Sequence, residues 1–325
     1  MVEMEANSSS VGMMSPCPSS YSTSNSSPTP TPTHLYSCLH PQTPKTPKVF
    51  MPMLRLWRPQ AQRNVRNQWS KLSSLRQQWY PSYSSGRSHA TSLVNSYLSH
   101  RYMDAMDLGV LSDMPNIRKK ACVKLLKQLE SQCSLLISSY KAMVSIVVDM
   151  TNASKSMRCF LITTSGSSIQ QFSNSSENGN DAGDGGGAPV VTFLSISAFE
   201  TLAEELVEMY KQELILKRLL VVELFSKVCK EMEQFNHMSW GEELYHGEAD
   251  DLIMCNLYAE DKAEPILPDI SGWKSKSSYV ESDINPNHDV LQVYITTWLA
   301  EVSIDAFRVE EIFSTVGEEL RMSFT

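Results

Sequence analysis

The stretch "CVKLLKQLESQCSLLISSYKAMVSIVVDM" (residues 122–150) decides the fold, because its apolar residues recur at alternating spacings of four and three. The residues in this phase are Cys122, Leu126, Leu129, Cys133, Leu136, Tyr140, Met143, Val147 and Met150. A seven-residue repeat of this kind is typical of a coiled coil or a long bundle helix. With Asp113 as N-cap and Pro115 in the first turn, the sequence predicts a helix over residues 115–158. At 1.5 Å per residue it is about 65 Å long and needs a partner helix.

A second apolar seam, over residues 197–236, supplies a candidate partner. The residues in phase are Phe199, Leu202, Leu206, Met209, Leu216, Leu220 and Leu224. Between the two helical patterns lies a stretch rich in Gly, Ser and Asn (residues 172–190), which has the composition of a disordered linker. We therefore predict that the two long helices fold back on each other as an antiparallel hairpin.

Shorter helical patterns flank this hairpin. Apolar spacing predicts helices over residues 61–80 and 88–106, separated by Pro81 and Gly86. From Pro286 onward the spacing predicts two short helices, with a break near Ser303 and Ile304 and with Asp305 as a cap. Residues 237–286 are acidic and contain several prolines, so they predict an irregular loop with one short helix. The fold class expected is all-α, a long antiparallel helical hairpin or coiled-coil bundle with shorter flanking helices.

The N-terminal segment differs in composition from the rest of the chain. Residues 1–55 are dominated by Ser, Thr and Pro without apolar periodicity, which predicts a disordered tail. The tail is followed by a single helical bundle domain over residues 56–325. Six Ser/Thr-Pro dipeptides in the tail are minimal sites for a proline-directed kinase, and phosphorylation adds negative charge to a basic region. They begin at Ser15, Ser27, Thr29, Thr31, Thr43 and Thr46.

Charge and cysteine content indicate which partners and which cellular compartment suit the chain. Residues 1–103 carry a formal charge of +8 and the remainder carries −16, which favours internal pairing or separate partners. Seven cysteines without CxxC spacing indicate a reducing, intracellular compartment. No N-terminal apolar segment and no run of about 18 apolar residues is found, so we expect neither secretion nor a membrane span.

The sequence contains no pattern of residues that predicts catalysis. The segment "GDGGGAP" lacks the buried strand and the Lys-Ser/Thr that a phosphate-binding loop requires, and no nucleophile elbow, Walker sequence or HExxH is present. One potential metal cluster comprises His237, Glu242, Glu243, His246 and Asp250. A di-metal helix site needs a second copy of its Glu-x-x-His motif, which is missing, so a solvated acidic loop is favoured. We expect no enzyme activity, no cofactor and no metal.

The basic stretch from Arg55 to Arg87 supports two alternatives. Its interleaved residues Trp57, Trp69 and Trp79 suggest a nucleic-acid surface, although two of them share one apolar helix face and core packing explains them. The same stretch is poor in acidic residues and rich in Ser, as organelle transit peptides are, but the many prolines of the tail argue against that.

One block of the sequence resembles a known family. "LVEMYKQELILKRLLVVEL" (residues 206–224) resembles the signature helix of the cyclin-dependent kinase 2-interacting proteins. The matching positions are Leu206, Glu208, Met209, Tyr210, Glu213, Leu214, Leu216, Lys217, Arg218, Glu223 and Leu224. A second block is similar to the family's C-terminal helices. It comprises Trp298, Leu299, Asp305, Arg308, Glu311 and Gly317. The resemblance covers about residues 60–325.

This resemblance implies a non-enzymatic adaptor in the nucleus. The partners it implies are cyclin-dependent kinase and replication kinase subunits and an assembly of AAA-ATPase subunits, with an indirect nucleic-acid association and no membrane. The processes it implies are DNA replication, the genome-maintenance checkpoint and ribosome biogenesis. A nucleic-acid-associated protein that uses the basic N-terminal half is the alternative.

The charged residues within the apolar run of the signature block raise the question of what they contact. Glu213 and Lys217 are an i, i+4 pair worth only about 0.3 kcal/mol if exposed, too little to explain charges at these positions. We therefore predict that Tyr210, Glu213, Lys217 and Arg218 face a partner protein, where a desolvated Arg or Tyr contributes about 2 kcal/mol or more. The second block adds two partner-binding candidates, Trp298 and Arg308. The alternative is a solvated stripe that flanks the seam.

Overall fold

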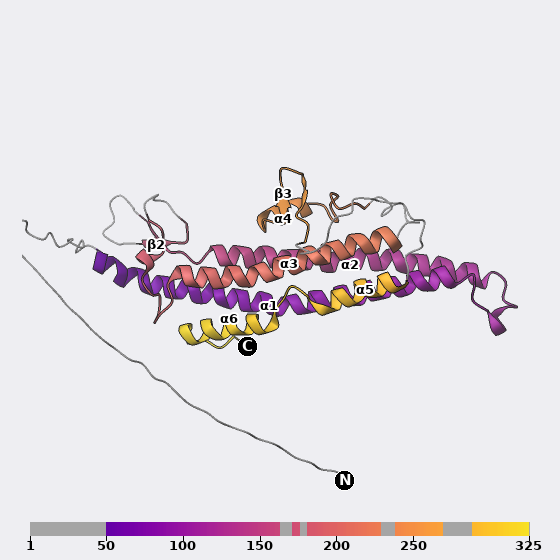
Figure 1. Cartoon of the computed structure of the whole chain (residues 1–325), viewed down its shortest axis with the longest axis horizontal. Helices are drawn as coiled ribbons and strands as arrows, with labels where there is room; N and C mark the ends of the chain where they lie inside the picture. Colours follow the sequence, from indigo (N-terminus) through magenta and orange to yellow (C-terminus); the bar gives the residue numbers. More distant parts are fainter. Residues whose placement is uncertain (1–49, 163–170, 176–180, 229–237, 269–287, 325) are drawn as a thin grey trace, which may run out of the picture. The chain divides into compact units, whose positions relative to one another are not determined.

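The computed structural model describes residues 50–162, 171–175, 181–228, 238–268 and 288–324, which belong to one compact unit that spans Lys48–Thr325. Within these ranges the chain forms six α-helices and two small antiparallel hairpins, so the expected all-α class is confirmed (Figure 1). The predicted tail lies outside the described residues up to residue 49. Its last residues, from Phe50, already belong to the first helix.

Helix α1 (Phe50–Tyr102) is one continuous element of 53 residues that includes Pro59 and Pro81. The prediction of two helices separated at Pro81 and Gly86 is therefore wrong. A proline inside a helix removes one backbone hydrogen bond and costs about 3 kcal/mol. Here the buried face continues across the proline, and the packing of that face outweighs the loss. Its buried apolar residues are Trp57, Ala61, Val65, Trp69, Leu72, Leu75, Trp79, Tyr83, Ala90, Leu93 and Val94.

Helix α2 (Ile117–Lys155) follows a connection that contains the 3-10 turn η1 (Gly109–Leu111) and returns antiparallel to α1. At the C-terminal end of α2, Asn64 Nδ2 donates to the Ser156 carbonyl at 2.7 Å, and further along the pair His89 Nδ1 lies 3.0 Å from Gln132 Oε1. The predicted seam is buried from Leu129 onward. Helix α1 is the main partner of α2, and the expected partner, α3, contacts it less extensively. The long α1 was not predicted, which explains the difference.

Helix α3 (Ile196–Val228) runs parallel to α1 and antiparallel to α2 and is buried on a wide arc. Helices α5 (His288–Ala300) and α6 (Ala306–Leu320) run antiparallel to α1 and α3, and together they act as a fourth, interrupted helix (Figure 1). The predicted break and cap are confirmed, because Asp305 Oδ1 accepts hydrogen bonds from the backbone of Phe307 and Arg308 at 2.9 and 3.1 Å. The architecture is an up-down-up-down bundle.

The remaining elements are short and lie at the side of the bundle. Strands β1 (Phe160–Ile162) and β2 (Gln171–Ser173) pair after α2. Between α3 and α5 the chain forms α4 (Glu248–Met254) and the paired strands β3 (Tyr258–Ala259) and β4 (Glu264–Pro265). This agrees with the single short helix expected in residues 237–286, of which 237 and 269–286 lie outside the described residues.

The second half of the predicted linker is not a free linker. Residues 181–190 include the 3-10 turn η2 (Gly185–Gly187) and lie against the bundle. Gly185 has a φ of +64°, and a Cβ there would lie 2.5 Å from the ring of Trp57. Only glycine tolerates both the left-handed backbone and this close approach, so packing requires a glycine at position 185. A Gly/Ser/Asn-rich composition fits both a flexible linker and a segment that packs closely against its neighbours, and the sequence alone does not distinguish the two.

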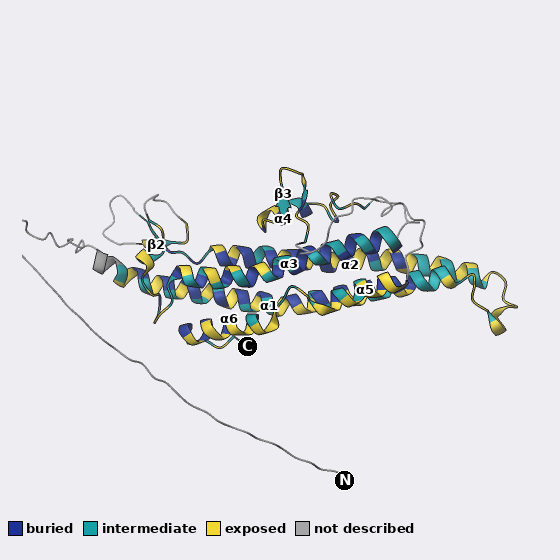
Figure 2. Ribbon diagram, in the orientation of Figure 1, coloured by how far each residue is buried: buried dark blue, intermediate teal, exposed yellow. Residues whose placement is uncertain are grey.

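Burial is concentrated where α1, α2 and α3 face one another, and the outer faces are exposed (Figure 2). Among the described helices, α2 alone is long and apolar enough to cross a membrane by length and composition, and half of that stretch is buried inside the bundle. Core helices of bundles share this character, so the observation does not favour a membrane span.

Candidate functional site

The charged residues in the middle of α3 lie inside the bundle. Glu213 and Lys217 are both 0% exposed and form an ion pair. Lys217 Nζ also donates to the Trp298 carbonyl at 2.6 Å, and Glu213 Oε2 accepts from the Ser303 backbone at 2.9 Å. These two hydrogen bonds connect α3 to the end of α5 and to the break before α6. Burial lowers the pKa of Lys217, while the carboxylate of Glu213 opposes that change.

Aromatic rings complete the surroundings of Lys217. Its Nζ lies 5.5 Å from the ring centroid of Tyr83 and 5.3 Å from that of Trp298, distances at which a cation is attracted to the ring face. Trp298 is itself fully buried, and its ring occupies space above Gly86, where a Cβ would lie 2.6 Å from Trp298 Cζ2. Gly86, which was interpreted as a helix end, instead lets α5 approach α1.

Arg218 is the centre of a second buried polar cluster. Its guanidinium pairs with Glu248 through Nε–Oε1 at 2.9 Å and Nη2–Oε2 at 3.2 Å, and both side chains are 1% exposed. The remaining donors reach the carbonyls of Trp240 and Glu242, both at 2.7 Å. The Arg218 Cζ atom lies 4.8 Å from the Trp240 ring centroid. The planar, five-donor guanidinium thus holds residues 240–248 against α3.

Tyr210 packs against α1. Its ring makes an edge-to-face contact with Trp79, with centroids 5.2 Å apart and an interplanar angle of 86°. Burial raises the pKa of Tyr210 to about 12. Trp79 Nε1 donates to Glu301 Oε1 at 2.8 Å, and burial raises the pKa of Glu301. These contacts connect α1, α3 and the break between α5 and α6.

The predicted partner-facing edge is therefore corrected. Tyr210, Glu213, Lys217 and Arg218 are interior residues with partners in the same chain, and Trp298 is interior as well. In this structure they offer no surface to another protein, and they are not a solvated stripe either. Pattern reasoning missed Glu248 and Trp240, because both lie in the segment interpreted as an irregular loop. The available signal was the cation at Arg218 within an apolar run, since a buried charge requires a partner.

Arg308 is the one predicted site residue that reaches the surface. Its side chain is 36% exposed and pairs with Glu205 through Nε–Oε1 at 2.5 Å and Nη2–Oε2 at 2.7 Å. Its Nη1 also donates to Glu311 Oε2 at 2.7 Å. The hydrogen bonds from Arg308 lower the pKa of Glu205. This exposed cluster joins α3 to α6 beside Phe307, so Arg308 remains a candidate for contact with a partner.

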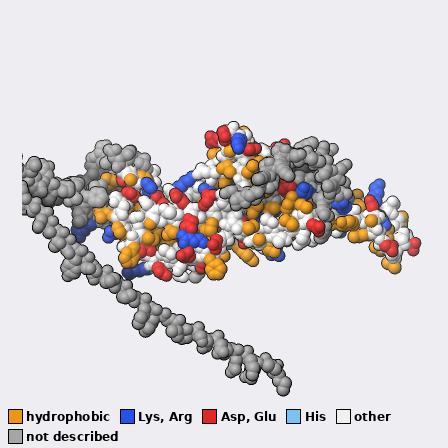
Figure 3. All heavy atoms as spheres, in the orientation of Figure 1, with side chains coloured by type: hydrophobic (Ala, Val, Ile, Leu, Met, Phe, Trp, Pro, Cys, Tyr) orange, Lys and Arg blue, Asp and Glu red, His pale blue; other side chains and the backbone are white. Residues whose placement is uncertain are grey.

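Four exposed apolar residues are spaced along α5, the break after it and the start of α6. We call Val293, Leu299, Val302 and Phe307 the α5–α6 surface; Phe307 is 90% exposed and Val302 65%. Residues 290–300 contain no charged side chain, which is unusual for the exposed face of a helix. Hydrophobic side chains are visible at the surface in this region in Figure 3. Exposed apolar residues that gather in one region are candidates for an interaction site.

The potential metal ligands do not form a site in the described residues. No group of three or more His, Cys, Asp or Glu side chains there is arranged to hold a metal ion, and His237 lies outside those residues. Glu243 instead accepts hydrogen bonds from the backbone of Gly247 and Ala249 at the start of α4, at 3.3 and 3.0 Å. Glu242 serves through its carbonyl as a partner of Arg218.

The aromatic residues of the basic stretch are not available to nucleic acid. Trp57, Trp69 and Trp79 are 4%, 0% and 3% exposed, so they cannot stack on bases. Two of the cations are also engaged in ion pairs, Lys71 with Asp149 and Arg76 with Glu310. Neither the three tryptophans nor these two ion-paired cations favour the nucleic-acid alternative.

The described residues define a helical-bundle protein in which buried charged contacts join α3 to the α5–α6 region and to residues 240–248. The chain matches no family model and no curated protein. The resemblance of residues 206–224 therefore rests on the quoted residues alone.

Proposed function

We propose that the protein is a non-enzymatic helical adaptor of nuclear multiprotein complexes. Its proposed partners are cyclin-dependent and replication kinase subunits and AAA-ATPase subunits, in DNA replication, checkpoint control or ribosome biogenesis. The support is the resemblance of two sequence blocks to the cyclin-dependent kinase 2-interacting proteins. A helical fold is compatible with such a role, since helices present long surfaces to partners.

The two blocks that carry the resemblance meet in space. Lys217 in the first block bonds to the carbonyl of Trp298 in the second. Asp305 caps α6, and Gly317 lies where a Cβ would be 2.8 Å from the Met322 carbonyl. Several matching positions are thus framework residues that fix the packing of α3 against α5 and α6. The family and its partners are part of the proposal.

The surface through which the adaptor binds is proposed to be the α5–α6 surface rather than the interior residues of α3. Interface centres are depleted in charged residues and enriched in aromatic residues and Arg. Phe307 projects almost fully into solvent and lies next to Arg308, a pair of residue types that carry binding energy when they are buried by a partner. The uncharged outer face of α5 extends this surface.

A capture experiment tests the proposal. The tagged full-length protein is purified from cells, and the bound proteins are identified by mass spectrometry, with the Phe307→Glu, Val302→Asp double variant in parallel. The first change places an acid in the first turn of α6, where the helix dipole favours it, so the fold is preserved. Leu135→Glu, on the outer face of α2 at 41% exposure, is the matched control.

The proposal predicts recovery of kinase or AAA-ATPase subunits with the wild type and the control, and at least a tenfold loss with the double variant. Recovery of neither class of subunit, with the wild-type protein folded and nuclear, contradicts the adaptor function. Equal recovery of these subunits with all three proteins would agree with the adaptor function but would show that the α5–α6 surface is not the contact.

A further inference from the structure

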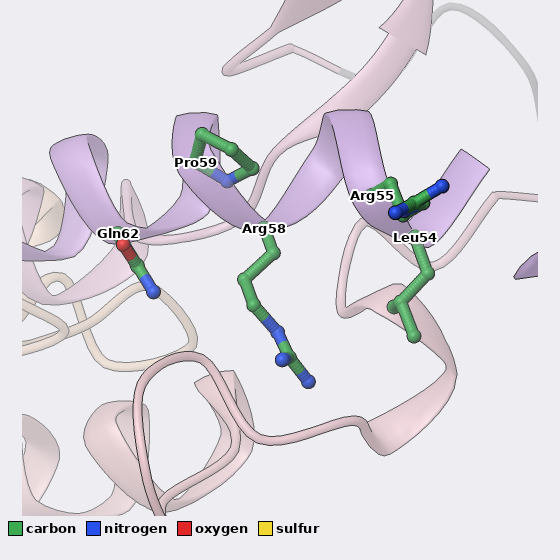
Figure 4. A pocket seen from close by; sticks show the side chains of 5 residues that line it. All are labelled: Leu54, Arg55, Arg58, Pro59 and Gln62. Atoms are coloured by element: carbon green, nitrogen blue, oxygen red, sulfur yellow. The ribbon is translucent and has the colours of Figure 1, made fainter. Parts of the chain in front are cut away.

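A pocket near the start of α1 contains two arginines for which the described residues provide no acidic partner. It has a volume of about 420 Å³ and is lined by Leu54, Arg55, Arg58, Pro59 and Gln62. Leu54, Arg58 and Gln62 are spaced by four residues, so they extend to the same side of the helix (Figure 4). Gln62 Nε2 is fixed by a 2.8 Å bond to the Val190 carbonyl, which anchors one wall.

The guanidinium of Arg58 is the group that indicates a ligand. Its Nε atom is buried and has no hydrogen-bond partner among the described residues. A buried donor without a partner costs free energy, so such a group in a native structure calls for an explanation. Arg55 lies one turn away and is exposed. No carboxylate occurs in the sequence between Asn7 and Met103, so the surrounding helix does not neutralise either cation.

We propose that this pocket binds a phosphomonoester group carried by a phosphorylated Ser/Thr-Pro peptide. A guanidinium donates two parallel hydrogen bonds to phosphate oxygens, and paired arginines are a recurring means of phosphopeptide recognition. The side chains of Leu54 and Pro59 offer apolar contact beside the cations, which suits the proline ring that follows the phosphorylated residue. The volume lies within the range of about 300–1,000 Å³ that is usual for ligand sites.

The required peptide chemistry is present in the sequence itself. Six Ser/Thr-Pro dipeptides precede the pocket, and Thr43 is followed by Pro44 within the segment "LHPQTPKTPK" (residues 39–48). A phosphate on such a residue carries about −1.5 to −2 charges at neutral pH. This inference concerns a binding site and is independent of the adaptor proposal.

The test uses the unphosphorylated full-length protein and a synthetic peptide that copies residues 39–48 with phosphothreonine at position 43. Binding is measured by isothermal titration calorimetry, with the unphosphorylated peptide and inorganic phosphate as comparison ligands. Arg58→Gln removes the charge at the pocket and keeps a polar side chain. Arg63→Gln removes an exposed cation of the same helix that does not line the pocket, and it serves as the matched control.

We expect the phosphopeptide to bind wild type and Arg63→Gln equally and Arg58→Gln about tenfold or more weakly, in line with the loss of a charged hydrogen bond. The unphosphorylated peptide should bind at least tenfold more weakly than the phosphopeptide. Equal losses in the two variants would show non-specific attraction to basic surface and overturn the site. Binding of inorganic phosphate without binding of the phosphopeptide would overturn the peptide assignment. Circular dichroism melts of both variants show whether a loss reflects unfolding.

Discussion

Removal of the carboxylate from the buried Arg218–Glu248 pair should cost more stability than most surface changes do. In Glu248→Ala the guanidinium stays buried at 1% exposure and keeps its bonds to two carbonyls but loses its counter-charge. One partner removed from a buried ion pair destabilises a protein by about 3–5 kcal/mol. Since single domains are stable by about 5–15 kcal/mol, the variant loses a large share of its total stability.

The comparison variant is Glu205→Ala, which breaks the ion pair with Arg308. That pair is 40% and 36% exposed, and such pairs contribute about 0–1 kcal/mol. Both variants are measured by urea unfolding followed by circular dichroism at pH 7. A third protein, with Arg218→Met added to Glu248→Ala, removes the orphaned charge and should recover part of the lost stability. Equal stability of the Glu248→Ala and Glu205→Ala proteins would refute the reasoning, because the Arg218–Glu248 pair would then be solvated.

Three further predictions test other contacts. Gly86→Ala should lower the melting temperature although alanine is the better helix former. The new Cβ lies 2.6 Å from Trp298, and overpacking costs about 1–3 kcal/mol. A rise in melting temperature would contradict the packing of α5 on α1. Burial alone would raise the pKa of Glu319, but hydrogen bonds from the backbone N–H groups of residues 192–194 outweigh burial and hold this pKa below its ordinary value of 4.5. These bonds to the carboxylate therefore stabilise the folded protein above pH 4.5, and that stabilisation is lost as pH falls through the folded pKa. Glu319→Gln should therefore be less stable than wild type at pH 7, and in urea unfolding the difference should shrink as the pH is lowered below 4.5. A difference that does not change with pH speaks against these bonds. Burial raises the pKa of Cys159 and Cys255 to about 11, so mass spectrometry should find both thiols unalkylated by iodoacetamide at pH 8 until urea is added.

The long helices could be predicted from sequence because their apolar spacing is regular over many turns. The seam from Leu129 to Met150 is buried as its period requires, and Asp305 caps α6 as its position before an apolar run predicts. The continuity of α1 through Pro81 could not be predicted, since the local rule that ends a helix at proline is overridden by tertiary packing. The same packing decides that α1, rather than α3, is the main neighbour of α2.

The contacts of the charged residues in α3 could not be predicted from the sequence of that helix, because their partners lie elsewhere in the chain. Charges within an apolar run are compatible with a partner protein, with solvent or with a buried partner from the same chain. Arg218 is paired with Glu248, which lies thirty residues further along the chain in a segment without clear periodicity. The Lys217 site likewise requires a carbonyl of α5 that only the assembled bundle supplies.

The central claim is that the charged centre of α3 lies inside the protein and joins its helices, and lysine footprinting of the isolated, folded chain tests it most directly. Lys217 is fully buried, whereas Lys120 and Lys124 on the outer face of α2 are exposed. After brief treatment with an amine-reactive ester, mass spectrometry should find Lys120 and Lys124 modified and Lys217 unmodified, until urea unfolds the protein. Modification of Lys217 at the rate of the two exposed lysines in the folded protein would contradict the buried network and restore an exposed edge on α3.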